Sequence, residues 1–295
     1  GRYGGSTWYA DNFGLDLARN CIAQVDIDSP GCRWATEYYD ISWMTETEDF
    51  CVETIFDATG KAASGERPHQ AGDYSFNNIG LTGFYMLLSS MPRELIAEKG
   101  YYPTGGCGGN IAWHTENDQL EIADEENLMR DLRVYVLSLL RIINRPVHPF
   151  DFRRLAAEFA ETLAKYGSAA RGVVDFRDAT QALAELQDEL DAFYTTLASL
   201  QDRAVTDPAV RTVNDAILNL GRTLVPIHFT RHGRFRTEPA LPIAPLPDLQ
   251  PAMVLPHVQD HERRVVATHV RRGLNRVAWT FQEATESVRS ARQKL

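Results

Sequence analysis

The second half of the chain carries an apolar seam that restricts it to helices packed in a bundle. Apolar side chains recur at alternating three- and four-residue intervals: Phe176, Ala179, Leu183, Leu186, Leu190, Phe193, Leu197 and Leu200. Residues three and four positions apart lie on one face of an α-helix. The spacing therefore predicts a long helix with one face buried against neighbouring helices.

Further helices are expected on both sides of a proline-rich connection. Asp207-Pro208 is a favourable helix start, because aspartate caps free backbone amides and proline fits the first turn. The helix that follows carries Val210, Val213, Ile217, Leu220 and Leu224 at the same spacing. Six prolines from Pro239 to Pro256 predict an extended connection. A last helix is expected from about His257 to the C-terminus, with Gly273 as a candidate break.

The first half alternates between strand-like and helix-like segments. Residues 8–19 and 49–59 predict helices, and the apolar runs 21–27 and 80–89 predict strands. Asp124 is the expected cap of a helix that ends before Pro146, with an apolar face formed by Leu128, Leu132, Val136, Leu139 and Ile143. Such alternation predicts an α/β fold with a mostly parallel sheet flanked by helices.

Charge is distributed unevenly and supports two domains. Residues 1–144 carry 10 basic and 22 acidic side chains, whereas residues 145–295 carry 20 and 18, within a total net charge of −10. We therefore expect an α/β domain over residues 1–145 and a helical domain over 146–295. No basic, aromatic-interleaved face indicates nucleic-acid binding, and no apolar run approaches the ~20 residues needed to cross a bilayer.

Two aspartates close the first predicted strand. Asp26 and Asp28 lie at its carboxyl end, where open α/β sheets place their ligands, and side chains two apart point to the same side. A carboxylate there can bind a metal. Asp28 can equally cap the Ser-Pro-Gly turn that follows.

A histidine follows a glycine-rich run in the first half of the chain. Residues 105–118 read GGCGGNIAWHTEND, with His114 and Asp118 four positions apart. Neutral imidazole is a good metal ligand where a second group fixes its tautomer. An ordinary loop histidine is the alternative. Cys107 in the same run is interpreted as structural, and Cys32 could pair with Cys51 in an oxidising compartment.

Four segments occur in an order that suggests a family: GSTWYADN at 5–12, AQVDIDS at 23–29, AGDYSFNNIGL at 71–81 and WHTEND at 113–118. Over about residues 1–143 the chain resembles the second half of the catalytic domain of the zinc exopeptidases that include bacterial aminopeptidases, glutamate carboxypeptidase II and the transferrin receptor. Residues 146–295 are more distantly similar to the helical dimerisation domain of that family.

The resemblance implies roles for five residues. Asp28 and His114 each bind one ion of a zinc pair, and Asp73, Tyr74 and Trp113 border the substrate. The chain departs from the family pattern at Gly72, where serine is common, and at Tyr74, where histidine is. Trp113 stands where the carboxypeptidase branch has a tyrosine, and its indole can only donate a hydrogen bond.

The same resemblance implies that other parts of the centre lie outside this sequence. The family's first histidine, bridging aspartate and Glu-Glu pair, which includes the general base, are expected upstream of Gly1. We therefore expect a fragment of a zinc metallopeptidase, of aminopeptidase or carboxypeptidase type, that is inactive by itself. A homodimer and an extracellular or periplasmic location are also implied. The alternative is a peptidase-like receptor or interaction scaffold without catalysis.

Overall fold

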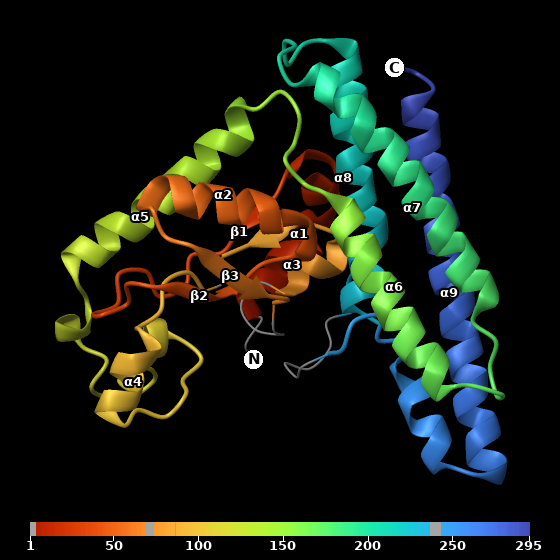
Figure 1. Cartoon of the computed structure of the whole chain (residues 1–295), viewed down its shortest axis with the longest axis horizontal. Coiled ribbons are helices and arrows are strands. Elements are labelled where there is room, and N and C mark those ends of the chain that lie inside the picture. The colour runs from red at the N-terminus through yellow and green to blue at the C-terminus, as the bar shows by residue number, and fades with distance from the viewer. Residues whose placement is uncertain (1–3, 69–73, 86, 237–242) are drawn as a thin grey trace. The chain divides into compact units, whose positions relative to one another are not determined.

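The chain divides into two compact units. The computed structural model describes residues 4–68, 74–85, 87–236 and 243–295 (Figure 1). An α/β unit comprises residues 24–68 and 83–145, and a helical unit comprises residues 1–23, 69–82 and 146–295. One boundary between the units falls after residue 145. Residues 4–23 and 74–82, which were expected in the first domain, belong with the later helices rather than with the strands.

The α/β unit contains two short parallel strand pairs. β1 (Gln24–Val25) pairs with β4 (Gly83–Phe84), and β2 (Tyr38–Ser42) pairs with β3 (Ala63–Glu66). Three α-helices accompany them: α2 (Glu48–Thr59), α4 (Arg93–Lys99) and α5 (Glu125–Asn144). The pairing is parallel, as predicted, but the expected strands at 21–27 and 80–89 are each only two residues long. One cause is that the Cys21 amide still donates to the Leu17 carbonyl, so the chain leaves its first helix late.

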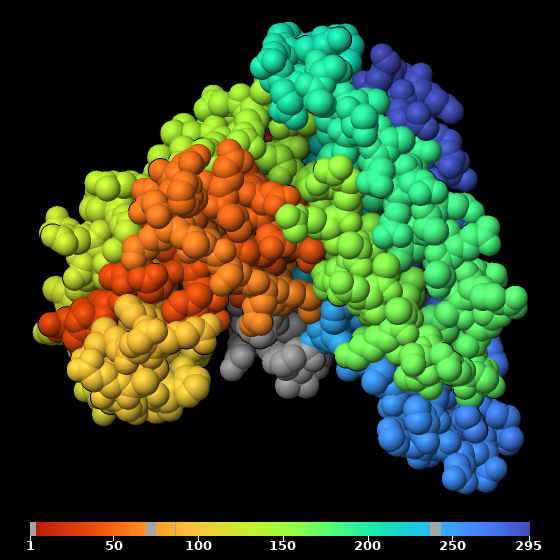
Figure 2. Space-filling view, viewed as in Figure 1, coloured from red at the N-terminus to blue at the C-terminus, as the bar shows by residue number. Residues whose placement is uncertain are grey.

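α5 begins where the sequence predicts and packs on α2. The Asp124 carboxylate accepts a hydrogen bond from the Asn127 amide at 2.8 Å, which caps the helix. Its buried face includes Val134 and Tyr135, and the Tyr85 and Tyr135 rings meet edge to face. The apolar face expected from the sequence is instead exposed, and the yellow-green side chains of α5 lie at the surface in Figure 2.

The helical unit confirms the predicted seam. α6 (Phe152–Ala169), α7 (Arg177–Leu197), α8 (Pro208–Phe229) and α9 (Asp260–Arg292) lie side by side (Figure 1). Every seam residue from Phe176 to Leu200 is buried. Asp207 caps α8 by accepting from the Ala209 amide at 2.8 Å. Formation of a homodimer through residues 146–295 stays a prediction.

Two expectations for the last third are wrong. Residues Gln250–His257 form a 3₁₀ helix rather than an extended connection. α9 runs through Gly273 without a break. The glycine is needed here because a Cβ atom would lie 2.8 Å from the Asp248 carbonyl oxygen. None of the helices in the described ranges combines the length and apolar character that crossing a membrane requires.

A buried arginine explains why the N-terminal helix belongs to the helical unit. α1 (Gly4–Asn20) packs on α3 (Tyr74–Ile79), and α3 packs on α8. Arg222 of α8 donates to the carbonyls of Ala18 and Gly80 at 2.9 Å and of Cys21 at 2.5 Å. Three carbonyls from two distant segments thus share one guanidinium, which has the fork of donors that this requires.

Candidate functional site

Asp28 lies three residues beyond β1, at the carboxyl end of that strand. Its carboxylate is exposed and accepts a hydrogen bond from the Ser29 hydroxyl at 2.7 Å. Ser29 adopts a left-handed backbone conformation, with φ of 51°. The carboxylate therefore keeps oxygen lone pairs for another ligand while it also stabilises the turn, so both interpretations of Asp28 fit its surroundings.

The loop that follows Asp28 is held by α5. The Gly31 amide donates to Asp131 Oδ2 at 2.9 Å, and Asn127 Nδ2 donates to the Cys32 carbonyl at 2.9 Å. Arg130 adds a hydrogen bond to the Ala35 carbonyl. The backbone of residues 31–35 is thus fixed by three side chains of one helix.

His114 lies in a turn at the far end of the glycine-rich run. Its side chain is exposed, its φ is 59°, and its ring stacks on Trp113 with centroids 3.8 Å apart. The turn is closed by hydrogen bonds from the Thr115 amide to the Ala112 carbonyl and from the Asp118 amide to the Thr115 carbonyl. The imidazole is consequently displayed on an ordered turn and orientated by an aromatic neighbour.

The glycines of this run make room for Trp113. A Cβ atom on Gly106 would lie 2.3 Å from the indole nitrogen of Trp113, so only glycine fits. Trp113 is partly buried and packs against a buried cluster of Cys32, Ala35 and Cys107. Its indole is therefore a structural support for the turn, whatever further part it takes in binding substrate.

The same cluster joins the Asp28 segment to the His114 segment. The Cys107 thiol donates to the Asp118 carboxylate at 3.7 Å, and the Cys32 thiol donates to the Ser29 carbonyl at 3.3 Å. Interaction with the neighbouring Cys107 thiol raises the pKa of Cys32, to which burial also contributes, and interaction with Cys32 lowers the pKa of Cys107. Two loops separated by some 75 residues of sequence therefore meet at one point. The Cys32–Cys51 pair considered from the sequence is absent among the described residues, where all four cysteines are free thiols.

Asp73 and Tyr74 are the other two residues expected beside the substrate. Asp73 lies outside the described residues, and Tyr74 begins α3 in the helical unit. Their expected place beside the substrate stays a prediction.

The donor set within the described ranges is incomplete for zinc. These residues contain no group of three or more histidine, cysteine, aspartate or glutamate side chains that could hold a metal ion. A catalytic zinc ion takes three protein ligands and keeps one position open. Asp28 and His114 can each supply one ligand, but these two residues do not by themselves make a zinc site.

A hollow beside the glycine-rich run adds groups that the sequence did not indicate. It has a volume of about 300 Å³, and its lining includes Tyr39, Arg93, Tyr102, Thr104 and Gly108. The Arg93 guanidinium lies over the Tyr39 ring, 4.1 Å from its centroid. An aromatic wall with a cation suits a planar or anionic group. These residues are scattered from 39 to 108, so no local pattern could reveal them.

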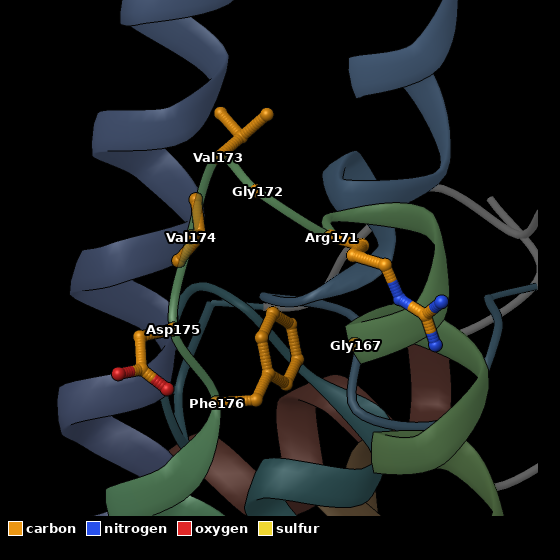
Figure 3. A pocket seen from close by; sticks show the side chains of 7 residues that line it. All are labelled: Gly167, Arg171, Gly172, Val173, Val174, Asp175 and Phe176. Atoms are coloured by element: carbon orange, nitrogen blue, oxygen red, sulfur yellow. The ribbon is translucent and has the colours of Figure 1, made fainter.

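The helical unit has a larger but chemically poorer hollow (Figure 3). It measures about 500 Å³ and lies at the turn between α6 and α7, with the Phe176 ring facing Gly167. The acidic side chain that lines this hollow, Asp175, points away from Arg171 and forms an ion pair with Arg177 at an N–O distance of 2.6 Å. This hollow therefore offers no convergent reactive groups, and the candidate site is the one in the α/β unit.

Comparisons of the sequence with models of known protein families and with curated proteins found no match to either.

Proposed function

We propose that the chain is part of a zinc-dependent exopeptidase, in which Asp28 and His114 each bind one of two zinc ions. One observation carries the proposal: the loop after Asp28 and the loop before His114 pack on each other through Cys32 and Cys107. Carboxylate and imidazole are both established zinc ligands. The four ordered sequence segments supply the family resemblance.

The remaining ligands and the general base are proposed to come from polypeptide other than these 295 residues. Zinc, when bound, activates a water molecule and polarises the substrate carbonyl. This chain would hold one ligand for each ion, orientate His114 against Trp113 and border the peptide with Asp73 and Tyr74. The hollow lined by Arg93 and Tyr39 is large enough for a substrate side chain. The chain alone is assigned no catalytic step.

The test compares the chain alone with the longest protein that contains it. We expect two tightly held zinc ions in the longer protein, measured by elemental mass spectrometry, and hydrolysis of aminoacyl or peptidyl reporters that a chelator abolishes. His114→Ala and Asp28→Asn should each lower zinc content and reduce turnover by at least about 100-fold. His232→Ala, in the helical unit, is the control and should retain activity.

Two results would overturn the proposal. One is a longer protein that hydrolyses the reporters at the same rate in the presence and absence of chelator. The other is normal turnover and zinc content in the His114→Ala variant.

A non-catalytic interaction scaffold is a second candidate, favoured by the exposed apolar face of α5. Seven large apolar side chains there are available for contact with another polypeptide. The zinc measurement separates the two proposals, because a scaffold of this kind would hold no metal in its longer form.

A further inference from the structure

Two free thiols share the small buried cluster between the Asp28 and His114 loops. Cys32 and Cys107 are each 6% exposed, and Ala35 is the third buried member. Each thiol is ordered by its own weak hydrogen bond, to the Ser29 carbonyl and the Asp118 carboxylate respectively. The two cysteines thus lie in one buried cluster, against which Trp113 packs.

The residue after Cys107 also lies close to the segment that follows Cys32. A Cβ atom on Gly108 would lie only 2.7 Å from the Ala35 Cβ atom, so the segments next to the two cysteines are almost in contact. A disulfide needs Cα atoms within roughly 7 Å. The hydrogen bonds from α5 hold the Cys32 side, and a hydrogen bond from the Met91 amide to the Gly108 carbonyl holds the Cys107 side.

The other two cysteines are engaged elsewhere. Cys51 is fully buried in α2, and its thiol donates to Thr47 Oγ1 at 3.7 Å. Cys21 belongs to the helical unit and donates to the Ala23 carbonyl at 3.3 Å. Neither shares the cluster of Cys32 and Cys107.

We propose that Cys32 and Cys107 form a disulfide that links the Asp28 loop to the His114 loop, with a small disulfide such as oxidised glutathione as the oxidant. Formation of this bond does not depend on zinc binding by Asp28 or His114.

The reaction is a balanced thiol–disulfide exchange. The Cys107 thiolate attacks one sulfur of oxidised glutathione, and a glutathione thiolate leaves and takes up a proton. The Cys32 thiolate, its proton lost to solvent, then attacks Cys107 Sγ and displaces the second glutathione. Two protein thiols are oxidised and one glutathione disulfide is reduced to two thiols. Cys107 suits the first attack because its interaction with the neighbouring Cys32 thiol lowers its pKa.

The link would change stability as well as connectivity. It closes a chain segment of 75 positions, and cross-links over long segments restrict the unfolded state most. We expect the thermal midpoint of the α/β unit to rise by roughly 5 °C or more on oxidation and to fall back on reduction.

The experiment maps the pairing directly. The chain is equilibrated with oxidised and reduced glutathione, its remaining thiols are alkylated, and it is cleaved on the amino side of aspartate. This cleavage places the four cysteines in separate peptides. Mass spectrometry should find the Cys32 peptide joined to the Cys107 peptide with the loss of two hydrogens, and Cys21 and Cys51 alkylated.

Variants provide the matched controls. Cys32→Ser and Cys107→Ser should each abolish the link and the thermal shift, whereas Cys21→Ser should retain both. A wild-type chain in which Cys32 joins Cys51, or in which Cys32 and Cys107 stay alkylated across the whole redox range, overturns the proposal. Since the mapping uses the wild-type chain, a variant that folds poorly leaves the result of the mapping unchanged.

Discussion

At the scale of single residues, Asp131 organises the α/β unit more than any residue chosen from the sequence. It is fully buried and accepts hydrogen bonds from the Gly31 amide at 2.9 Å, the Tyr38 hydroxyl at 3.1 Å and the Ser89 hydroxyl at 2.6 Å. These donors come from three separate segments. The carboxylate thus holds the loop after Asp28 in place, since a buried polar group left without its partner is costly.

Replacing this carboxylate by an amide should be strongly destabilising. Asp131→Asn turns one acceptor into an NH₂ group that faces existing donors, and we expect a loss of about 3 kcal/mol in the free energy of unfolding. Urea denaturation followed by tryptophan fluorescence measures it. Asp40→Asn is the control, because Asp40 is exposed, and should change stability by less than ~0.5 kcal/mol. Equal effects of the two variants would contradict the assigned role of Asp131.

At the scale of elements, α5 has an unusual division of faces. Its buried face carries polar Asn127, Asp131 and Ser138 beside Val134 and Tyr135. Its exposed large apolar side chains are Leu128, Met129, Leu132, Val136, Leu139, Leu140 and Ile143. At about 100° per residue these seven fall within an arc of roughly 120°. The apolar face therefore contributes little to the stability of this chain.

Two valines on this helix make a matched test. Val134 is 0% exposed and Val136 is 52% exposed. Val134→Ala leaves a cavity and should cost about 2 kcal/mol in the free energy of unfolding. Val136→Ala should change it by less than ~0.5 kcal/mol, while lowering the binding of a hydrophobic dye. Comparable losses in both variants would show that the outward face is covered in solution.

Local rules explain which elements were predictable. The caps at Asp124 and Asp207 and the seam of α7 follow from side chains within one or two turns, and all were confirmed. Strand length depends on the backbone of a distant partner, which is why β1 and β4 are shorter than their apolar runs. The break predicted at Gly273 was wrong for a similar reason, since the Asp248 carbonyl that requires this glycine lies 25 positions away.

The candidate site, too, could be predicted only where it depends on residues close together in the sequence. The sequence singles out Asp28 and His114 by type and local context, and both occupy ordered turns. Their link through Cys32 and Cys107 joins distant segments, and neither cysteine has a local pattern that predicts the other. Asp131 was equally hidden, because an aspartate on a helix ordinarily faces solvent.

At the scale of the whole molecule, each unit has a core of its own. The α/β unit buries Tyr38, Phe84 and Tyr135, and the helical unit buries Leu190, Phe193 and Phe281. The chain crosses from one unit to the other after residues 23, 68, 82 and 145. A chain with two separate cores can lose them at different denaturant concentrations.

We therefore expect two unfolding transitions rather than one. Val134→Ala should lower the urea midpoint of the transition that unfolds the α/β unit. Leu190→Ala, which truncates a side chain in the helical core, should lower the midpoint of the other transition by an amount equivalent to about 3 kcal/mol. Unfolding of the α/β unit should be observed through the fluorescence of Trp34, Trp43 and Trp113, which all belong to that unit. Unfolding of the helical unit should dominate the change in far-ultraviolet circular dichroism, because most of the long helices lie in that unit. Coincident transitions by both probes, displaced together by either variant, would show that the two cores unfold as one cooperative unit.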